Sequence, residues 1–377
     1  MIQKIINQFL NPYLGISMSN WFRLIISNKG VDLNRIPLAL FITLVLFLLA
    51  PFRLVAAIGR RAAINSANLS EPPIFIIGHW RSGTTHLHYL MSASGRFGGI
   101  YQIDAVYPYF SLWIRNEKSL LNGLLGKLSF TRRMDNVKFD VDSPAEEEFS
   151  IANTSPYSFF HGRVFRKHYR EYFKKFALLE GLSEKERAQW EQTYNDVMLQ
   201  SSVCSGGKRL LLKNPYNTSR MKALLSMYPG ARFVYIYRNP YDVYASTMNL
   251  HKKADCFALQ EVSPETMQKN VFFDYKSIHD RFYEESEQVP KGVCSCIKYE
   301  DLVENPLEEM ARVYEEIGLD GFDADSKGMI EYLESVKDYT KNSFRLGDDE
   351  RRNIEKEWGK YIRLMGYETE QKPMSNV

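Results

Sequence analysis

The stretch that decides the fold is Pro73-Ile-Phe-Ile-Ile-Gly-His-Trp-Arg-Ser-Gly-Thr-Thr-His86. Its apolar run from Ile74 to Ile77 predicts a buried β-strand, and a helical pattern then continues through Met91. Between the two, Gly78 and Gly83 bound a loop. Backbone N–H groups and the helix dipole converge where such a loop meets a helix, so the stretch predicts a site for a phosphate-like anion.

The spacing of Gly78 and Gly83 is that of the Walker phosphate loop, Gly-x4-Gly-Lys-Ser/Thr. Thr84 stands where that loop has its lysine. The loop is therefore predicted to hold an anion without the cation that ATP γ-phosphate chemistry uses. Arg81, three residues before Thr84, supplies a positive charge instead.

The composition limits the classes of protein that the chain can form. Its 377 residues and 45% apolar content allow one large α/β domain with an accessory segment. The 48 basic and 45 acidic residues leave a net charge of +3, which predicts no nucleic-acid partner. The cysteines form no CxxC metal pattern and predict free thiols in a reducing cytoplasm: Cys204, Cys256, Cys294 and Cys296.

An apolar segment precedes the phosphate loop. Ile36 to Phe52 holds seventeen residues without a charge, the lower limit for a membrane span, and Pro37 and Pro51 bracket it. Basic residues flank both ends about equally, so the positive-inside rule gives no orientation. We expect a helix that lies in or dips into the cytoplasmic face of a membrane. A buried or oligomer-forming helix of the soluble fold is the alternative.

Strands that alternate with helices predict an α/β fold of three layers, with a central, mostly parallel sheet. Ser143 and Pro144 predict an N-cap and first turn within a mostly helical region. Further strands are expected at 97–104, 209–213, 232–237 and 292–298, and further helices at 219–228, 240–249, 307–317 and 349–365. The expected organisation is a helical, membrane-associating segment at 1–70, a P-loop domain at 71–367 and a polar tail at 368–377.

The carboxyl ends of parallel strands open on one edge of a sheet, where ligands bind. At this edge, Arg81 and the amides of Gly83-Thr84-Thr85 are predicted to hold one anionic group. Arg238, at the end of a neighbouring strand, and Ser246, two turns along the next helix, are predicted to hold a second. This arrangement suits a nucleotide with charged groups at both its 5′ and 3′ positions.

Over roughly residues 72–365 the sequence resembles the P-loop sulfotransferases, which use 3′-phosphoadenosine 5′-phosphosulfate (PAPS). The resemblance rests on the loop ending at Thr85, on Leu212-Lys-Asn-Pro215, on Phe233-Val-Tyr-Ile-Tyr-Arg-Asn-Pro240 with Ser246, and on Tyr299-Glu-Asp-Leu302. The Arg-Ser-Gly-Thr-Thr loop is most similar to the bacterial branch of the family. The branch with lysine in place of that arginine is less similar.

The resemblance implies roles for individual residues. The 3′-phosphate would be bound by Arg238 and Ser246, and Lys213 at its strand end would contact the donor near the bridging oxygen. The 5′-phosphosulfate would be bound by the first loop: Arg81, Ser82, Gly83, Thr84 and Thr85. Lys341 and Arg345 offer further contacts to the 3′-phosphate, with a solvated loop as the alternative. No metal is expected, because a sulfuryl group carries less charge than a phosphoryl group and basic groups can stabilise the leaving phosphate.

The acceptor hydroxyl needs a general base within hydrogen-bond reach. Pro144-Ala-Glu-Glu-Glu-Phe149 resembles the Pro-x-Glu-Asp-Glu-Phe segment of bacterial members, with Glu147 where Asp is expected. Adjacent residues of a helix face directions about 100° apart, so at most one or two of the three carboxylates can reach the site. The choice among them stays open: Glu146, Glu147 and Glu148. Ser143-x-x-Glu146 is also a capping box, in which Glu146 would do no more than close a helix start.

Other groups are alternatives for the base. His79 lies inside the loop and could touch donor or acceptor, and His88 is expected to be packed on the following helix. Some family members have a carboxylate at about the position of Gln102, but an amide cannot act as a base. Asp104 lies two residues away from that position.

Taken together, the residues and the resemblance predict a cytoplasmic PAPS-dependent sulfotransferase, associated with the inner face of a membrane. The acceptor is expected to be a hydrophobic alcohol such as a sterol or lipid, given the segment 36–52 and an aromatic content of 14%. A glycan sulfotransferase is one alternative. A P-loop small-molecule kinase, disfavoured by Thr84, and a membrane-tethered protein that binds a nucleotide without catalysis are the others.

Overall fold

The computed structural model describes residues 11–116, 130–131, 138–139, 143–253, 257–337 and 345–368. Its centre is a parallel sheet of four strands in the order β4-β1-β5-β6. These strands are β1 (Ile74–Ile77), β4 (Leu211–Lys213), β5 (Arg232–Tyr237) and β6 (Cys294–Lys298). A separate antiparallel pair joins β2 (Phe130–Thr131) to β3 (Lys138–Phe139).

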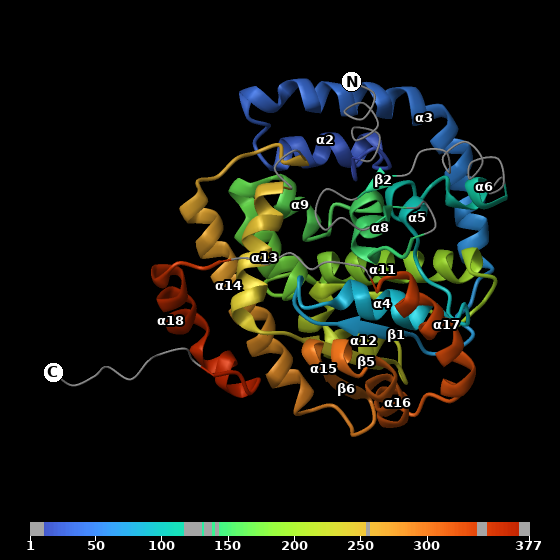
Figure 1. The fold of residues 1–377 in the computed structure, drawn as a ribbon. Coiled ribbons are helices and arrows are strands. Elements are labelled where there is room, and N and C mark those ends of the chain that lie inside the picture. Colours follow the sequence, from blue (N-terminus) through green and yellow to red (C-terminus); the bar gives the residue numbers. More distant parts are fainter. Residues whose placement is uncertain are drawn as a thin grey trace.

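Helices cover both faces of the parallel sheet (Figure 1). Phe75 and Ile77 face one core, which is closed by α11 (Glu184–Cys204), α12 (Met221–Met227) and α14 (Pro264–Ser286). Ile74 and Ile76 face the other core, which is closed by α4 (Thr84–Ser92), α16 (Pro306–Glu316) and α17 (Phe322–Ser335). Successive side chains of a strand point to opposite faces, so a strand buried on both faces reads as a continuous apolar run. The predicted three-layer α/β fold is confirmed.

An N-terminal layer covers one end of the domain (Figure 1). It consists of α2 (Met18–Ser27), the short η1 (Leu33–Arg35) and the long α3 (Ile36–Asn65). The predicted apolar helix is therefore confirmed, but Pro51 does not bound it. Pro51 lies inside α3, which continues for 30 residues because its later turns pack against α11.

The remaining helices complete the domain around the sheet. Trp358 of the last helix stacks on Tyr275 of α14 at 3.8 Å between ring centroids, which fixes the C-terminal end against the domain. The helices are α5 (Gln102–Val106), α6 (Ser111–Asn116), α8 (Glu147–Thr154), α9 (Phe160–Val164), η2 (Arg166–His168), α10 (Tyr169–Tyr172), η3 (Phe173–Ala177), η4 (Pro215–Ser219), α13 (Pro240–Lys253), α15 (Tyr299–Glu304) and α18 (Asp348–Leu364).

Two predictions of local structure are wrong. Residues 97–104 do not form a strand: Gly98 and Tyr101 make isolated bridges, and α5 begins at Gln102. Adjacent glycines at 98 and 99 offer no side chains to pack on a strand. Ser143 is not an N-cap, because residues 143–145 are extended and hydrogen-bond to the segment 100–102. Glu146 is the N-cap of α8, so the predicted capping box does not form.

Some predictions fall on parts of the chain without a description. Cys256 and Lys341 lie outside the described residues, as does the predicted polar tail after Glu368. The other cysteines are free thiols: Cys204, Cys294 and Cys296.

Candidate active site

The phosphate loop connects the end of β1 to the start of α4. Gly78 and Gly83 both have positive φ, 142° and 98°. A Cβ at Gly78 would lie 2.2 Å from the carbonyl oxygen of Ile236, and one at Gly83 would lie 2.2 Å from the Tyr299 ring. Only glycine fits both positions, so the loop runs close against the next two strand ends.

The first turn of α4, next to this loop, has no side-chain cap. Its N-cap is Gly83, which has no side chain to accept from the first turn. The first N–H groups of a helix lack intrahelical partners, so those of Thr84 and Thr85 are suited to an anion. Ser82 is buried within the loop, and the N–H of Gly78 donates to Thr218 Oγ1 at 2.7 Å.

Arg81 joins the two predicted anion sites. Its backbone has φ 72°, a left-handed conformation that costs a non-glycine residue about 1–3 kcal/mol and marks many functional loops. Its Nε donates to Ser246 Oγ of α13 at 2.8 Å. The residue predicted for the 5′ group therefore contacts the one predicted for the 3′-phosphate.

Arg238 follows β5, and its guanidinium lies 4.7 Å from the centre of the Tyr299 ring. It donates from Nη2 to Asp242 Oδ2 at 2.8 Å. Its buried Nε has no partner within the described part of the chain, and a buried donor of this kind suits an anionic ligand. Arg345 is exposed before α18, and its contact with the 3′-phosphate stays a prediction.

Lys213 and Glu146 meet at the same edge of the sheet. Lys213 ends β4, where it is in register with Ile76 of β1. Its Nζ donates to Glu146 Oε1 at 2.5 Å, and the two side chains are 6% and 22% exposed. The pair joins the end of a strand to the start of α8 across 67 residues.

The two carboxylates after Glu146 point into the protein. Glu147 accepts from Tyr194 Oη at 2.8 Å and from Asn217 Nδ2 at 2.6 Å, and burial raises its pKa above the ordinary range. Glu148 pairs with buried Arg220 at 2.8 Å. Burial alone would raise the pKa of Glu148, but the charge of Arg220 and the hydrogen bonds that the carboxylate accepts together outweigh burial, and the pKa is lowered. Of the three candidates for the base, Glu146 alone faces Lys213.

The two histidine alternatives for the base are buried, and the pKa of each is lowered. Burial, and then the charge of His279, lower the pKa of His79 well below its ordinary value. Burial and the charge of Lys213 lower the pKa of His88 to about 3. Gln102 is buried and donates to a backbone carbonyl, while Asp104 forms an ion pair with Arg115. Asp104 is thereby engaged in a structural contact.

Two residues that were not predicted from the sequence, Arg163 and Tyr216, lie next to the ion pair of Lys213 and Glu146. Arg163 of α9 donates from Nη1 to Tyr216 Oη at 3.3 Å, and its guanidinium lies 5.8 Å from the Trp80 ring of the phosphate loop. Burial lowers the pKa of Arg163, but Tyr216, Tyr169 and Glu146 raise it above its ordinary value. Tyr216 directly follows the Lys-Asn-Pro motif, which is a usable signal, whereas no motif surrounds Arg163.

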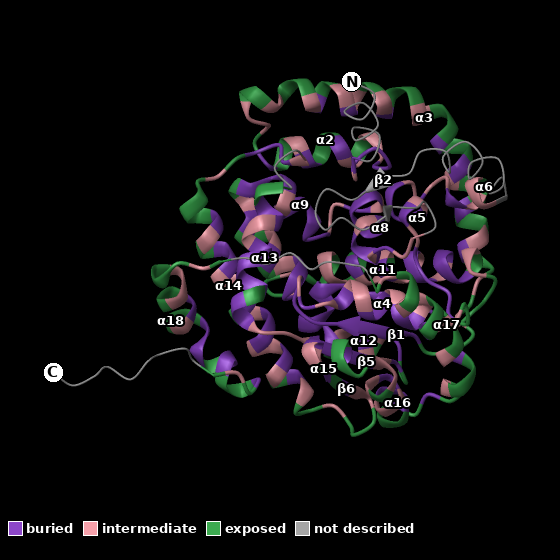
Figure 2. Ribbon diagram, viewed as in Figure 1, coloured by how far each residue is buried: buried purple, intermediate pink, exposed green. Residues whose placement is uncertain are grey.

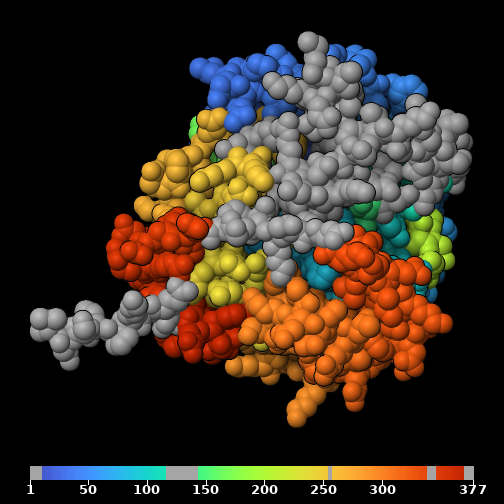
Figure 3. All heavy atoms as spheres, in the orientation of Figure 1, coloured from blue at the N-terminus to red at the C-terminus, as the bar shows by residue number. Residues whose placement is uncertain are grey.

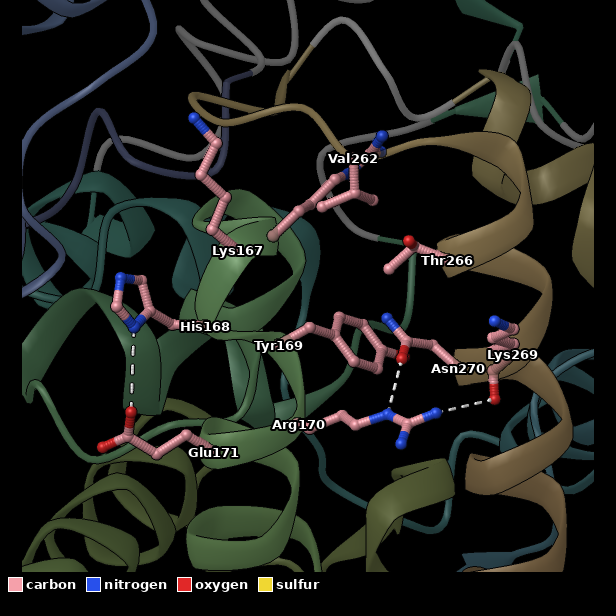
Figure 4. Close-up of a pocket in the computed structure, with 10 residues that line it drawn as sticks. Lys167, His168, Tyr169, Arg170, Glu171, Val262, Thr266, Lys269 and Asn270 are labelled. Atoms are coloured by element: carbon pink, nitrogen blue, oxygen red, sulfur yellow. Dashed lines mark hydrogen bonds and ion pairs between the residues drawn. The ribbon is translucent and has the colours of Figure 1, made fainter.

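A cavity of about 340 Å³ lies between α10 and the start of α14 (Figure 4). Its lining is basic and includes Lys167, Arg170 and Lys269, but none of the predicted site residues. Arg170 is held by Asn270 Oδ1 at 2.9 Å and by the carbonyl of Lys269 at 3.3 Å. Lys167 forms an ion pair with Asp32, which places this cavity beside the N-terminal layer.

Comparisons with known proteins identify the family of the chain and agree with its fold. The sulfotransferase family matches residues 72–324. The chain is 31% identical over 363 residues, 94% of its length, to the omega-hydroxy-beta-dihydromenaquinone-9 sulfotransferases Stf3 of Mycobacterium bovis and Mycobacterium tuberculosis, with 91% of each relative covered. The chain therefore belongs to the sulfotransferase family and is a sulfotransferase, as its motifs predicted.

Two solved structures show the same fold. Sulfotransferase STF9 from Mycobacterium avium has a TM-score of 0.67 and 16% identity, with 95% of this chain and 98% of that chain covered. Sulfotransferase STF1 from Mycobacterium tuberculosis has a TM-score of 0.60 and 18% identity, with 83% and 85% covered. Family membership implies PAPS as the sulfuryl donor and sets aside the kinase and the non-catalytic binding protein.

Proposed function

We propose that the protein transfers a sulfuryl group from PAPS to the hydroxyl of a hydrophobic lipid alcohol, with Glu146 as the general base. The observation that carries this proposal is the ion pair between Glu146 and Lys213. It puts a carboxylate and a cation 2.5 Å apart at the carboxyl end of the sheet, where the phosphate loop also begins. A base for the acceptor and a charge for the leaving phosphate are thus side by side.

The described residues fit the donor. The 5′ end would lie against Arg81, Ser82 and the uncapped N–H groups of Gly83-Thr84-Thr85. The 3′-phosphate would take the buried Nε of Arg238, which has no protein partner in the described residues, together with Ser246. PAPS supplies the activated sulfuryl group. No metal is assigned a part, because the cations around the donor supply the charge stabilisation.

The proposed reaction has one displacement. Glu146 accepts the proton of the acceptor hydroxyl, and the oxygen forms its bond to sulfur as the bond from sulfur to the phosphate oxygen breaks. Adenosine 3′,5′-bisphosphate leaves in line with the attack. Lys213 and the amides of the phosphate loop stabilise the charge that develops on the leaving phosphate.

Several observations support a lipid acceptor. The Stf3 relatives are named for omega-hydroxy-beta-dihydromenaquinone-9, and we carry over only its class, a hydrophobic lipid alcohol. Tyr216, which lies beside Arg163, packs on the rings of Trp80 and Phe159 at 5.6 and 4.7 Å between centroids, so the surroundings of the proposed base are apolar. The apolar α3 supports a location at the cytoplasmic face of a membrane.

The test uses ³⁵S-labelled PAPS with a membrane-lipid extract, a series of alcohols of increasing chain length and a set of oligosaccharides. We expect a labelled sulfate ester on hydrophobic alcohols, identified by mass spectrometry. Lys213→Met is the control and should lose most of the transfer. Label that appears only on oligosaccharides would show that the acceptor class is wrong, and binding of the bisphosphate without any transfer would refute the assigned chemistry.

A further inference from the structure

The inner side of α3 packs on the protein along its whole length. The residues buried on this side recur every three, four or seven positions, which is one face of a helix. They are Ala39, Ile42, Leu46, Arg53, Ala56, Arg60 and Ile64. The helix therefore lies against the domain from its first turns to its last.

The outer side of α3 is apolar and exposed (Figure 2). We define this outer face as Leu40, Leu44, Phe47, Leu48, Phe52, Leu54, Val55 and Ile58, which are 58–73% exposed. Twelve of the seventeen exposed large apolar residues in the described chain lie between Phe22 and Ile58. A contiguous apolar face of this kind marks an interaction surface, and in Figure 3 this segment, in blue, forms one end of the molecule.

Two arginines argue against a membrane span. The helix is long and apolar enough to cross a bilayer by length and composition. Arg53 and Arg60, however, point inward, where their guanidinium groups lie 5.7 and 5.6 Å from the Tyr109 ring. Arg60 donates from Nε to Gln200 Oε1 at 2.6 Å. A spanning orientation would carry both charges and the domain packed on them into the hydrocarbon, which is costly.

The charge of this layer selects an anionic surface. Residues 11–65 hold six basic residues and one acidic residue, a net charge of +5, while the whole chain has +3. The one acidic residue, Asp32, is paired with Lys167. Arg53 and Arg60 point inward, and Arg35 and Arg61 pair with Glu261 and Asp196. The exposed Arg23 and Lys29 provide the charge toward such a surface. Basic groups beside an apolar helix face are the pattern of a helix that lies in the interface of an anionic membrane.

We propose that α3 lies flat in one leaflet of an anionic membrane, with its outer face inserted and the domain remaining in the cytoplasm. This proposal rests on the proposed function, because the flat position of α3 would place the active-site helices beside the lipid that carries the acceptor hydroxyl. Phe160 and Val164 of α9 and Ala152 of α8 pack in the same core as Ile42 of α3. Helix α8 begins directly after Glu146, and α9 carries Arg163. A lipid alcohol in the leaflet can thus reach the base without crossing bulk water.

The first test is co-sedimentation of the full chain with vesicles of equal parts phosphatidylglycerol and phosphatidylcholine. Leu44→Ser, Phe47→Ser and Phe52→Ser combined should lower the bound fraction by about tenfold or more, because three inserted side chains are lost. The matched control is Ile330→Ser with Leu364→Ser, which are 51% and 56% exposed on other helices and should bind as the unaltered protein does. Pure phosphatidylcholine should bind more weakly.

A second measurement separates a flat helix from a span. Spin labels at Leu40→Cys, Leu48→Cys and Ile58→Cys, in a chain without its native cysteines, should report one similar shallow depth in these vesicles. Depths that increase steadily from 40 to 58 would overturn the proposal. So would equal vesicle binding by the triple variant, or a dimer in solution that the triple variant abolishes without any vesicle binding.

Turnover of a short, water-soluble alcohol distinguishes this proposal from the proposed function. The triple variant should keep that turnover while it loses transfer to alcohols embedded in vesicles. Loss of both, in protein that still binds adenosine 3′,5′-bisphosphate, would show that the outer face supports the active site and is not a docking surface.

Discussion

The donor side and the acceptor side of the site are built in different ways. Lys213 ends β4, Arg238 directly follows β5 and Arg81 lies in the loop after β1, so the register of three neighbouring parallel strands brings them to one edge. Glu146 and Arg163 come from helices and reach the same place through contacts with Lys213 and Tyr216. The comparison teaches that the donor side depends on the core of the fold, whereas the acceptor side depends on a few polar contacts between distant segments.

The largest effect is expected on the acceptor side. Glu146→Gln removes the proposed base, and kcat should fall by about 10³-fold, within the usual range for general base catalysis. Affinity for adenosine 3′,5′-bisphosphate should stay the same or rise, since the donor contacts come from the strand ends and Glu146 no longer competes for Lys213. Glu147→Gln is the control, because an amide can still accept from Tyr194 and Asn217, and it should retain turnover. Transfer assays measure the turnover and calorimetry measures the affinity. Loss of turnover in Glu147→Gln with turnover retained in Glu146→Gln would identify Glu147 as the base.

The second prediction concerns the support behind the acceptor side. Glu148→Gln leaves the buried guanidinium of Arg220 without its charge partner and should destabilise the protein by about 3 kcal/mol. Asp349→Asn, at an exposed ion pair with Arg352, should change the free energy of unfolding by less than about 0.5 kcal/mol. Urea unfolding measures both. Equal small effects would mean that the Glu148 pair does not hold α8 in place.

The third prediction tests the donor side. Arg238→Met should weaken the affinity for adenosine 3′,5′-bisphosphate by about 10- to 100-fold, the effect of losing a charged hydrogen bond. The turnover of bound donor should change little. Arg345→Met is the comparison, and calorimetry on both variants decides whether the late loop shares the 3′-phosphate. Unchanged affinity in Arg238→Met would remove this residue from the donor site.

The smallest effect is a dependence on pH. Burial and the charge of Lys213 hold the pKa of His88 at about 3, and the unfolded chain has an ordinary histidine pKa of about 6.5. Between these values the unfolded chain binds more protons, so stability falls as pH falls. When the pH falls from 7.5 to 5, the free energy of unfolding of the unaltered protein should decrease by about 2 kcal/mol more than that of His88→Gln. Parallel stability curves for the two proteins would contradict this assignment.

The same comparison explains what could be predicted from the sequence. β5 has the predicted bounds, 232–237, because a strand buried on both faces is a continuous apolar run. The positions of Arg81, Lys213 and Arg238 at one edge follow from short motifs at strand ends. The predicted strand at 97–104 was wrong, because two adjacent glycines and hydrogen bonds to residues 143–145 determine the structure of this segment.

The acceptor side could not be resolved in this way. Three adjacent glutamates look alike in the sequence, and their difference comes from distant partners: Lys213, Asn217 and Arg220. Arg163 has no motif around it, and its place is set by contact with Tyr216, 53 residues away. The contact of Arg81 with Ser246 joins two motifs 165 residues apart. Such pairings depend on how helices pack, which residue spacing does not report.

With Glu146 as the proposed base, its ion pair with Lys213 also predicts an order of events. Without donor, the carboxylate of Glu146 is occupied by the ammonium group of Lys213. A bound donor would compete for Lys213 and so free Glu146. Addition of substrates should therefore be ordered, with PAPS first, and product-inhibition kinetics that show random addition would contradict it. The pair acts as an interlock that withholds proton abstraction until there is a sulfuryl group to transfer.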